Sequence, residues 1–222
     1  RHRNPAAALQ ADRATLLRQV IARVRVDDER KSEYTRPLHE QYAAAEFPRL
    51  QRRPDILLIQ VESLRADIFE TTPHPKIEEF VAQYPVQESA CHMSGATGTD
   101  YGTFSLLYGL SGIHFMACSE HGHRSWPLEL LRANGYEVHG VTSSNLRKWQ
   151  PAFFLNDQFD NLEAYTHLRF DHADRAAVTW LREFHRKRQS NRPLFQFVFL
   201  ASPHYNYFYP EQYEVDTPVF DP

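Results

Sequence analysis

The sequence predicts an α/β domain with a mostly parallel sheet flanked by helices. Apolar runs of strand length, such as DILLIQV and PLFQFVFLA, are separated along the chain by segments with helical periodicity. These runs are continuously apolar and do not alternate, which is typical of parallel strands buried on both faces. With 222 residues and 42% hydrophobic content, the chain is large enough for one domain with a real core.

The first 53 residues differ in character from the rest. Residues 5–33 carry apolar side chains near helical spacing among abundant Ala, Arg and Glu, which predicts an amphipathic, peripheral helix. Pro37 and Pro48 follow in a stretch of mixed charge, which predicts an extended connector. We therefore expect residues 1–53 to form a helix and connector ahead of a globular part at 54–222.

The globular part is predicted to alternate strands and helices around one glycine-rich loop. Each expected element is an apolar or periodic run that ends at Gly, Pro or a polar cluster. The expected strands are 55–62, 86–91, 136–142 and 194–201, and the expected helices are 75–84, 100–108, 125–134 and 171–189.

Composition and charge exclude several classes of protein. The formal net charge is −3, so the chain lacks the basic field that nucleic acid requires, and we expect no nucleic-acid partner. The longest apolar runs fall far short of the ~20 residues that span a bilayer. The chain starts without Met, has no signal-like segment and stops abruptly, so we expect it to be part of a longer protein.

The two cysteines carry little information about function. Cys91 and Cys118 form no CxxC pair and no metal-type cluster, which argues against a zinc knuckle or a dense disulfide framework. Two ordinary buried thiols and a single bridge flanking the glycine-rich loop both remain open.

Three groups with chemical potential fall at the predicted carboxyl ends of strands. Glu62 follows the run ILLIQV, the loop from Ser94 to Thr103 precedes a helix, and His204 follows FQFVFLASP. Ligand sites in open parallel sheets gather at this edge. These three groups are therefore expected at the same edge of the sheet.

Each of these residues also has a structural interpretation. Glu62 is either a carboxylate held at the mouth of the sheet or the first polar residue of a turn in which Ser63 caps the next helix. Thr99 is either a helix N-cap or a hydroxyl placed where a helix N-terminus stabilises an oxyanion or phosphate. His204 is either a site residue or a loop histidine among tyrosines.

The glycines of the loop favour the functional interpretation of Thr99. A cap does not need Gly95, Gly98 and Gly102 around it, whereas close approach of a tetrahedral anion to the backbone does.

Together these segments resemble the alkaline-phosphatase/sulfatase superfamily, and in particular its membrane-anchored, sulfatase-like branch. That branch includes lipoteichoic acid synthases, phosphoethanolamine transferases and inner-membrane sulfatase-like lipid regulators. PDILLIQVESLRAD resembles its first strand, HMSGATGTDYGTFSLLYGL its nucleophile loop and helix, WPLELLRANGYEVHGVTSS its next helix and strand, and RPLFQFVFLASPHYNYFYPEQY its substrate-side strand. The resemblance covers roughly residues 54–215 and implies an alkaline-phosphatase-like fold that is incomplete in this chain.

The resemblance assigns a role to each candidate residue. Glu62 matches the metal-binding carboxylate of the first strand, and Thr99 matches the nucleophile, which is also a metal ligand, with Thr97 as the fallback. His204 matches a histidine that contacts substrate, and Trp149 is a candidate for lining the headgroup pocket.

The sequence departs from ordinary sulfatases after the nucleophile position. Those enzymes place Cys or Ser there, followed by Pro-Ser-Arg, whereas this chain has Thr99 followed by Asp-Tyr-Gly-Thr. Sulfuric ester hydrolysis is therefore kept only as a second alternative.

The remaining metal ligands of the superfamily come from later segments with no counterpart up to Pro222. We expect one divalent ion, Zn or Mn, at a site that is incomplete in this chain, so the chain alone is expected to be inactive.

The resemblance implies a phospho-headgroup transferase or hydrolase that acts on a membrane lipid or envelope glycan through a covalent phospho-threonine. The first alternative is a catalytically inactive, lipid-sensing regulatory domain of the same fold. The resemblance also implies a parent protein embedded in the membrane through segments absent here, with residues 1–53 next to the membrane. Its domain would then lie on the periplasmic or extracellular face of the cytoplasmic membrane.

Overall fold

The computed structural model describes residues 46–65, 67, 74–89, 92–120, 122–146, 155, 158–204 and 209. The helix expected at 5–33 and the connector up to residue 45 lie outside these residues. The chain divides into two compact units. The first, here called the sheet unit, comprises Phe47–Gly112 and Arg124–Pro222, and the second comprises Arg1–Glu46 and Ile113–His123.

The sheet unit contains four parallel strands. They are β1 (Ile56–Val61), β2 (Glu137–Thr142), β3 (Asn161–Ala164) and β4 (Leu194–Leu200), in the spatial order β1-β4-β2-β3. Every neighbouring pair is parallel. The expected α/β class with a parallel sheet is therefore confirmed.

Strand β4 forms the centre of the core. It lies between β1 and β2, and six of its seven residues are buried. Phe197 and Phe199 are almost fully inaccessible to solvent. A strand hydrogen-bonded on both sides and covered on both faces needs the continuous apolar run found in the sequence.

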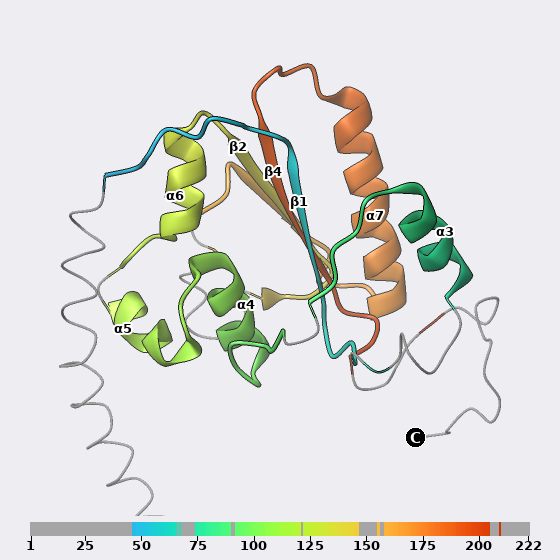
Figure 1. The fold of residues 1–222 in the computed structure, drawn as a ribbon. Helices are drawn as coiled ribbons and strands as arrows, with labels where there is room; N and C mark the ends of the chain where they lie inside the picture. Colours follow the sequence, from blue (N-terminus) through green and yellow to red (C-terminus); the bar gives the residue numbers. More distant parts are fainter. Residues whose placement is uncertain are drawn as a thin grey trace, which may run out of the picture. The chain divides into compact units, whose positions relative to one another are not determined.

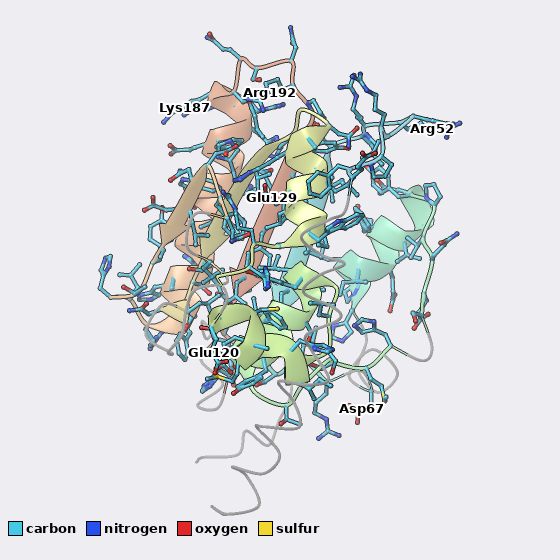
Figure 2. The ribbon with its side chains drawn as sticks, turned by 90° about the vertical axis from the view of Figure 1, so that its left-hand side faces the viewer. Arg52, Asp67, Glu120, Glu129, Lys187 and Arg192 are labelled. Atoms are coloured by element: carbon cyan, nitrogen blue, oxygen red, sulfur yellow. The ribbon has the colours of Figure 1, made fainter. Side chains whose placement is uncertain are left out.

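Helices lie on both sides of the sheet. Figure 1 shows α4 (Thr99–Tyr108) and α6 (Trp126–Ala133) on one side of the strands and α7 (Phe170–Lys187) on the other. α3 (Pro75–Gln83) has no buried residue. In Figure 2, Arg192, just before β4, and Asp67, beyond β1, lie at opposite ends of the sheet unit. The carboxyl ends of the strands are therefore on the Asp67 side.

One buried serine joins α4 to α6. Ser125, the N-cap of α6, accepts a hydrogen bond from the Leu128 amide and donates its hydroxyl proton to the Leu107 carbonyl at 2.7 Å. α4 itself ends at Gly109, whose φ of 66° is the left-handed conformation of a helix C-cap. The helix behind the glycine-rich loop is thus fixed at its far end.

The start of α7 is fixed by an ion pair. Arg169 donates two hydrogen bonds to Asp171, at 2.6 and 2.7 Å. These hydrogen bonds hold the pKa of the buried Asp171 carboxyl down at about 2.

Most expected elements are present within a residue or two of their predicted bounds, but the strand expected at 86–91 is not. Residues 86–89 form no strand, and 90–91 lie outside the described residues. The segment has few apolar residues, and Val86 is half exposed. Burial of apolar side chains therefore gives this segment little reason to join the sheet. β3 was not predicted, because its four residues include a single large apolar side chain.

The second unit contains an unpredicted helix, α5 (Phe115–Glu120), which follows the 3₁₀ turn η1 (Gly112–His114). Cys118 in α5 is a free, buried thiol, and burial raises its pKa to about 11. A bridge to Cys91 is thereby contradicted, and Cys91 itself lies outside the described residues. In the described part of the chain, we find no helix with the length and apolarity needed to cross a bilayer.

Candidate active site

Glu62 lies directly beyond β1, at the carboxyl edge of the sheet. Its backbone N–H donates to the Leu200 carbonyl at 2.8 Å, so the end of β1 is held in register with the end of β4. The next residue, Ser63, has a φ of 54°, which is uncommon for a residue other than glycine. This is not the extended conformation of a helix N-cap. The turn at Ser63 leaves the half-buried Glu62 side chain at the mouth of the sheet.

Thr99 and Glu62 are brought together by the structure. Thr99 is the first residue of α4, and Gly98 occupies the N-cap position. The Thr99 hydroxyl donates to Oε1 of Glu62 at 2.6 Å, a length typical of a hydroxyl bonded to a carboxylate. Two oxygens that bind one ion at about 2 Å lie at most about 4 Å apart, and this pair is within that distance. The N-cap interpretation of Thr99 is wrong, because Gly98 holds that position. The chemical roles of the two residues stay predictions.

The glycine-rich loop approaches α4 closely. Ser94 donates its hydroxyl to the Ala96 carbonyl at 2.6 Å, which folds the loop back on itself. A Cβ placed on Gly95 would lie 2.4 Å from Cβ of Ser105 on α4. Only a residue without a side chain fits there, so Gly95 sets how near the loop comes to the helix that carries Thr99.

Gly95→Ala is expected to lower the free energy of unfolding by about 1–3 kcal/mol, the usual cost of overpacking. The reason is that the new methyl group meets a Cβ fixed to the helix backbone, so the loop or α4 must move. Thermal melting measures the effect. Gly98→Ala is the control, because its Cβ would meet the end of the Asp100 side chain at 3.0 Å and the Tyr101 ring at an ordinary 3.7 Å. Equal melting temperatures for the two variants would contradict the close approach at Gly95.

Gln60 is a supporting residue that sequence reasoning missed. Its side-chain amide donates to the buried Thr103 hydroxyl at 3.0 Å, which joins β1 to α4 one turn beyond Thr99. The sequence signal that could have identified Gln60 is its polar side chain within an apolar strand, two positions before Glu62. Among the described residues, Oε1 of Gln60 and the Ser105 hydroxyl are buried without a hydrogen-bond partner. Both residues line a cavity of about 640 Å³ beside the glycine-rich loop.

The other candidate residues differ in how far the structure describes them. His204 lies in the turn after β4, at the same sheet edge as Glu62, and its ring meets the ring of Phe170 at 5.5 Å. Thr97 is exposed in the loop, two residues before Thr99. Trp149 lies outside the described residues, so its expected place in a headgroup pocket stays a prediction.

The Glu62 and Thr99 oxygens are chemically suited to a divalent ion, but they are only two ligands. A zinc site normally takes three ligands from the protein. Within the described ranges, no group of three or more His, Cys, Asp or Glu side chains could hold a metal ion. These residues therefore form at most part of a metal site.

Three comparisons relate this chain to known proteins. A family model described as Sulfatase matches residues 54–222. An uncharacterized protein from Haemophilus influenzae is 24% identical over 152 residues, which is 68% of this chain and 25% of that protein. The crystal structure of a protein in the alkaline phosphatase superfamily from Vibrio parahaemolyticus matches with a TM-score of 0.57 and 21% identity, covering 74% of this chain and 45% of that one. The chain thus spans less than half the length of either relative.

Proposed function

We propose, from the premise that this chain belongs to the sulfatase family, that it carries the nucleophile of a phospho-headgroup transferase or hydrolase. Family membership and the alkaline-phosphatase-like fold support a hydrolase-like or transferase-like function. The finer proposal rests on one observation, the hydrogen bond of 2.6 Å from the Thr99 hydroxyl to Glu62. The substrate is a phosphodiester of a membrane lipid or an envelope glycan.

Two features of the structure support Thr99 as the proposed nucleophile. The hydroxyl is at the N-terminus of a ten-residue helix, whose first N–H groups and dipole favour a phosphate group at that point. Its proton leaves along the hydrogen bond to Glu62, which also fixes the direction of the oxygen lone pairs. A divalent ion, which members of the superfamily usually bind, would lower the pKa of this hydroxyl when held by Glu62 and Thr99.

The proposed reaction has two steps. In the first, a bond forms between the Thr99 oxygen and phosphorus, the bond from phosphorus to the leaving alcohol breaks, and that alcohol leaves with the proton that Thr99 gave up. In the second, an acceptor hydroxyl or water attacks phosphorus and loses its proton, and the Thr99 oxygen leaves and takes up that proton. An acceptor hydroxyl makes the protein a transferase, and water makes it a hydrolase.

The proposal is tested on the full-length protein with phosphatidylethanolamine in detergent micelles. A phosphoethanolamine adduct on the peptide containing Thr99 is expected by mass spectrometry after rapid acid quenching. Treatment with EDTA should abolish turnover, and Zn²⁺ or Mn²⁺ should restore it. Turnover that survives chelation, or an adduct mapped to Thr97, would contradict the proposed chemistry.

A non-catalytic, lipid-sensing domain is the second candidate, and one observation favours it. Among the described residues, no group of three or more His, Cys, Asp or Glu side chains could hold a metal ion. In that case Thr99 and Glu62 fix the loop and carry out no chemistry. The EDTA experiment separates the two functions, because a regulator would show neither turnover nor an adduct.

The proposed substrate also sets a compartment. Envelope glycans and the headgroups of outer-leaflet lipids are found outside the cytoplasmic membrane, so we place the domain on its periplasmic or extracellular face. Reporter fusions to the full-length protein, with a phosphatase active only outside and a fluorescent protein active only inside, test this placement.

A further inference from the structure

The turn that carries His204 is held from two other elements of the sheet unit. The Ala201 N–H donates to the Ser143 hydroxyl at 2.9 Å and to Oδ1 of Asp174 at 2.8 Å. The Ser202 N–H donates to Oδ2 of Asp174 at 3.0 Å. The Asp174 carboxylate on α7 therefore accepts hydrogen bonds from the first two backbone amides after β4.

The same turn of α7 also meets the His204 ring. The His204 N–H donates to the Ala201 carbonyl at 2.9 Å, which closes a tight turn from Ala201 to His204. Phe170 lies four residues before Asp174, so both side chains are on one face of the helix. Its ring meets the His204 ring edge to face at 5.5 Å. The beginning of α7 thus contacts the turn at its start and at its end, beside the carboxyl end of β4 (Figure 1).

This turn is connected to the candidate nucleophile. Leu200, the residue before Ala201, accepts the hydrogen bond from the Glu62 amide, and Glu62 accepts the one from Thr99. Any displacement of the turn therefore changes where the His204 imidazole lies relative to the Thr99 hydroxyl. Hydrogen bonds from two amides to one ionised carboxylate are among the stronger neutral-to-charged contacts in a protein.

We infer that Asp174 is a positioning residue, which holds the turn after β4 so that the His204 imidazole faces the substrate bound at Thr99. The inference rests on the proposed function for the role of His204, while the holding of the turn stands on the contacts above. Asp174→Asn is the appropriate change, because the side chain keeps its size but its amide group presents a donor to one of the two backbone donors.

The first measurement needs no activity. In the full-length protein, Asp174→Asn should speed amide hydrogen exchange of Ser202 at least about tenfold, the scale set by losing one hydrogen bond to a charged group. The effect on Ala201 should be smaller, because its N–H keeps the hydrogen bond to the Ser143 hydroxyl. The NMR signal of the His204 ring should shift as its contact with Phe170 changes. Glu183→Gln is the matched control, since this carboxylate is on the same helix, is half exposed and pairs with Lys187 at 2.9 Å. Unchanged exchange in Asp174→Asn would overturn the inference.

The second measurement uses turnover. Asp174→Asn should lower kcat about tenfold, and the double variant Asp174→Asn with His204→Ala should be no slower than His204→Ala alone. Additive losses would show that Asp174 does not act through His204 and would overturn the positioning role. Absence of turnover in the unmodified protein would instead refute the proposed function, and the exchange and NMR results would still decide whether Asp174 places His204. If Asp174→Asn does not fold, Phe170→Leu tests the same turn by removing the ring contact between Phe170 and His204.

Discussion

Thr99→Ala is expected to abolish turnover of the phosphodiester by the full-length protein while leaving the fold almost intact. A methyl group cannot form the covalent intermediate, so kcat should fall by roughly a thousandfold or more, the scale of losing a nucleophile. The fold loses one half-exposed hydrogen bond to Glu62, worth about 1 kcal/mol. Steady-state kinetics, thermal melting and mass spectrometry of the Thr99 peptide measure the three effects.

Thr97→Ala is the matched control for this prediction. Thr97 is in the same loop, has the same chemistry and is exposed, so its loss should leave most of the turnover. A Thr99→Ala protein with undiminished turnover would rule out the covalent mechanism. A regulator, by contrast, should keep its cellular phenotype in the Thr99→Ala variant.

Glu62→Gln is expected to have the second largest effect. The amide keeps the shape of the side chain and can still accept the Thr99 hydrogen bond, but it carries no charge to hold a cation or to take up a proton. Turnover should fall about a hundredfold or more, because a neutral amide binds divalent ions much more weakly than a carboxylate does. The loss should be partly recovered at high Zn²⁺ or Mn²⁺ concentration. Stability should change by no more than about 0.5 kcal/mol, since the side chain is only half buried.

Glu88→Gln is the control for the loss of one carboxylate, because Glu88 is exposed in the segment after α3. Turnover of Glu62→Gln equal to that of Glu88→Gln would show that the carboxylate at the sheet edge takes no part in the reaction.

The sequence predicted the elements whose signals are local and strong. The run LFQFVFL is typical of a strand covered on both faces, and β4 is buried at every residue but its last. The meeting of Glu62 and Thr99 followed from topology, since a residue after a parallel strand and a residue at a helix start share the carboxyl edge.

What the sequence could not show depends on contacts between distant residues. Asp160, just before β3, accepts a hydrogen bond from the Val138 amide of β2 at 2.9 Å. This contact holds the short polar segment of β3 beside β2. Asp174 is one of many charged residues on an amphipathic helix, and only the folded chain reveals that it meets the amides of Ala201 and Ser202. The strand expected at 86–91 is not formed at 86–89, because no described strand lies beside this segment to pair with it.

The position of β1 at the border of the described sheet has a practical consequence for handling this polypeptide. Leu57 and Ile59 are 49% and 52% exposed, and no strand in the described part of the chain pairs with the outer side of β1. Natural sheets protect such borders with charge, proline or a covering segment, because bare apolar strands join edge to edge into aggregates. A preparation of these 222 residues should therefore grow more turbid with concentration, and Ile59→Lys should suppress that self-association without changing the residues proposed for chemistry.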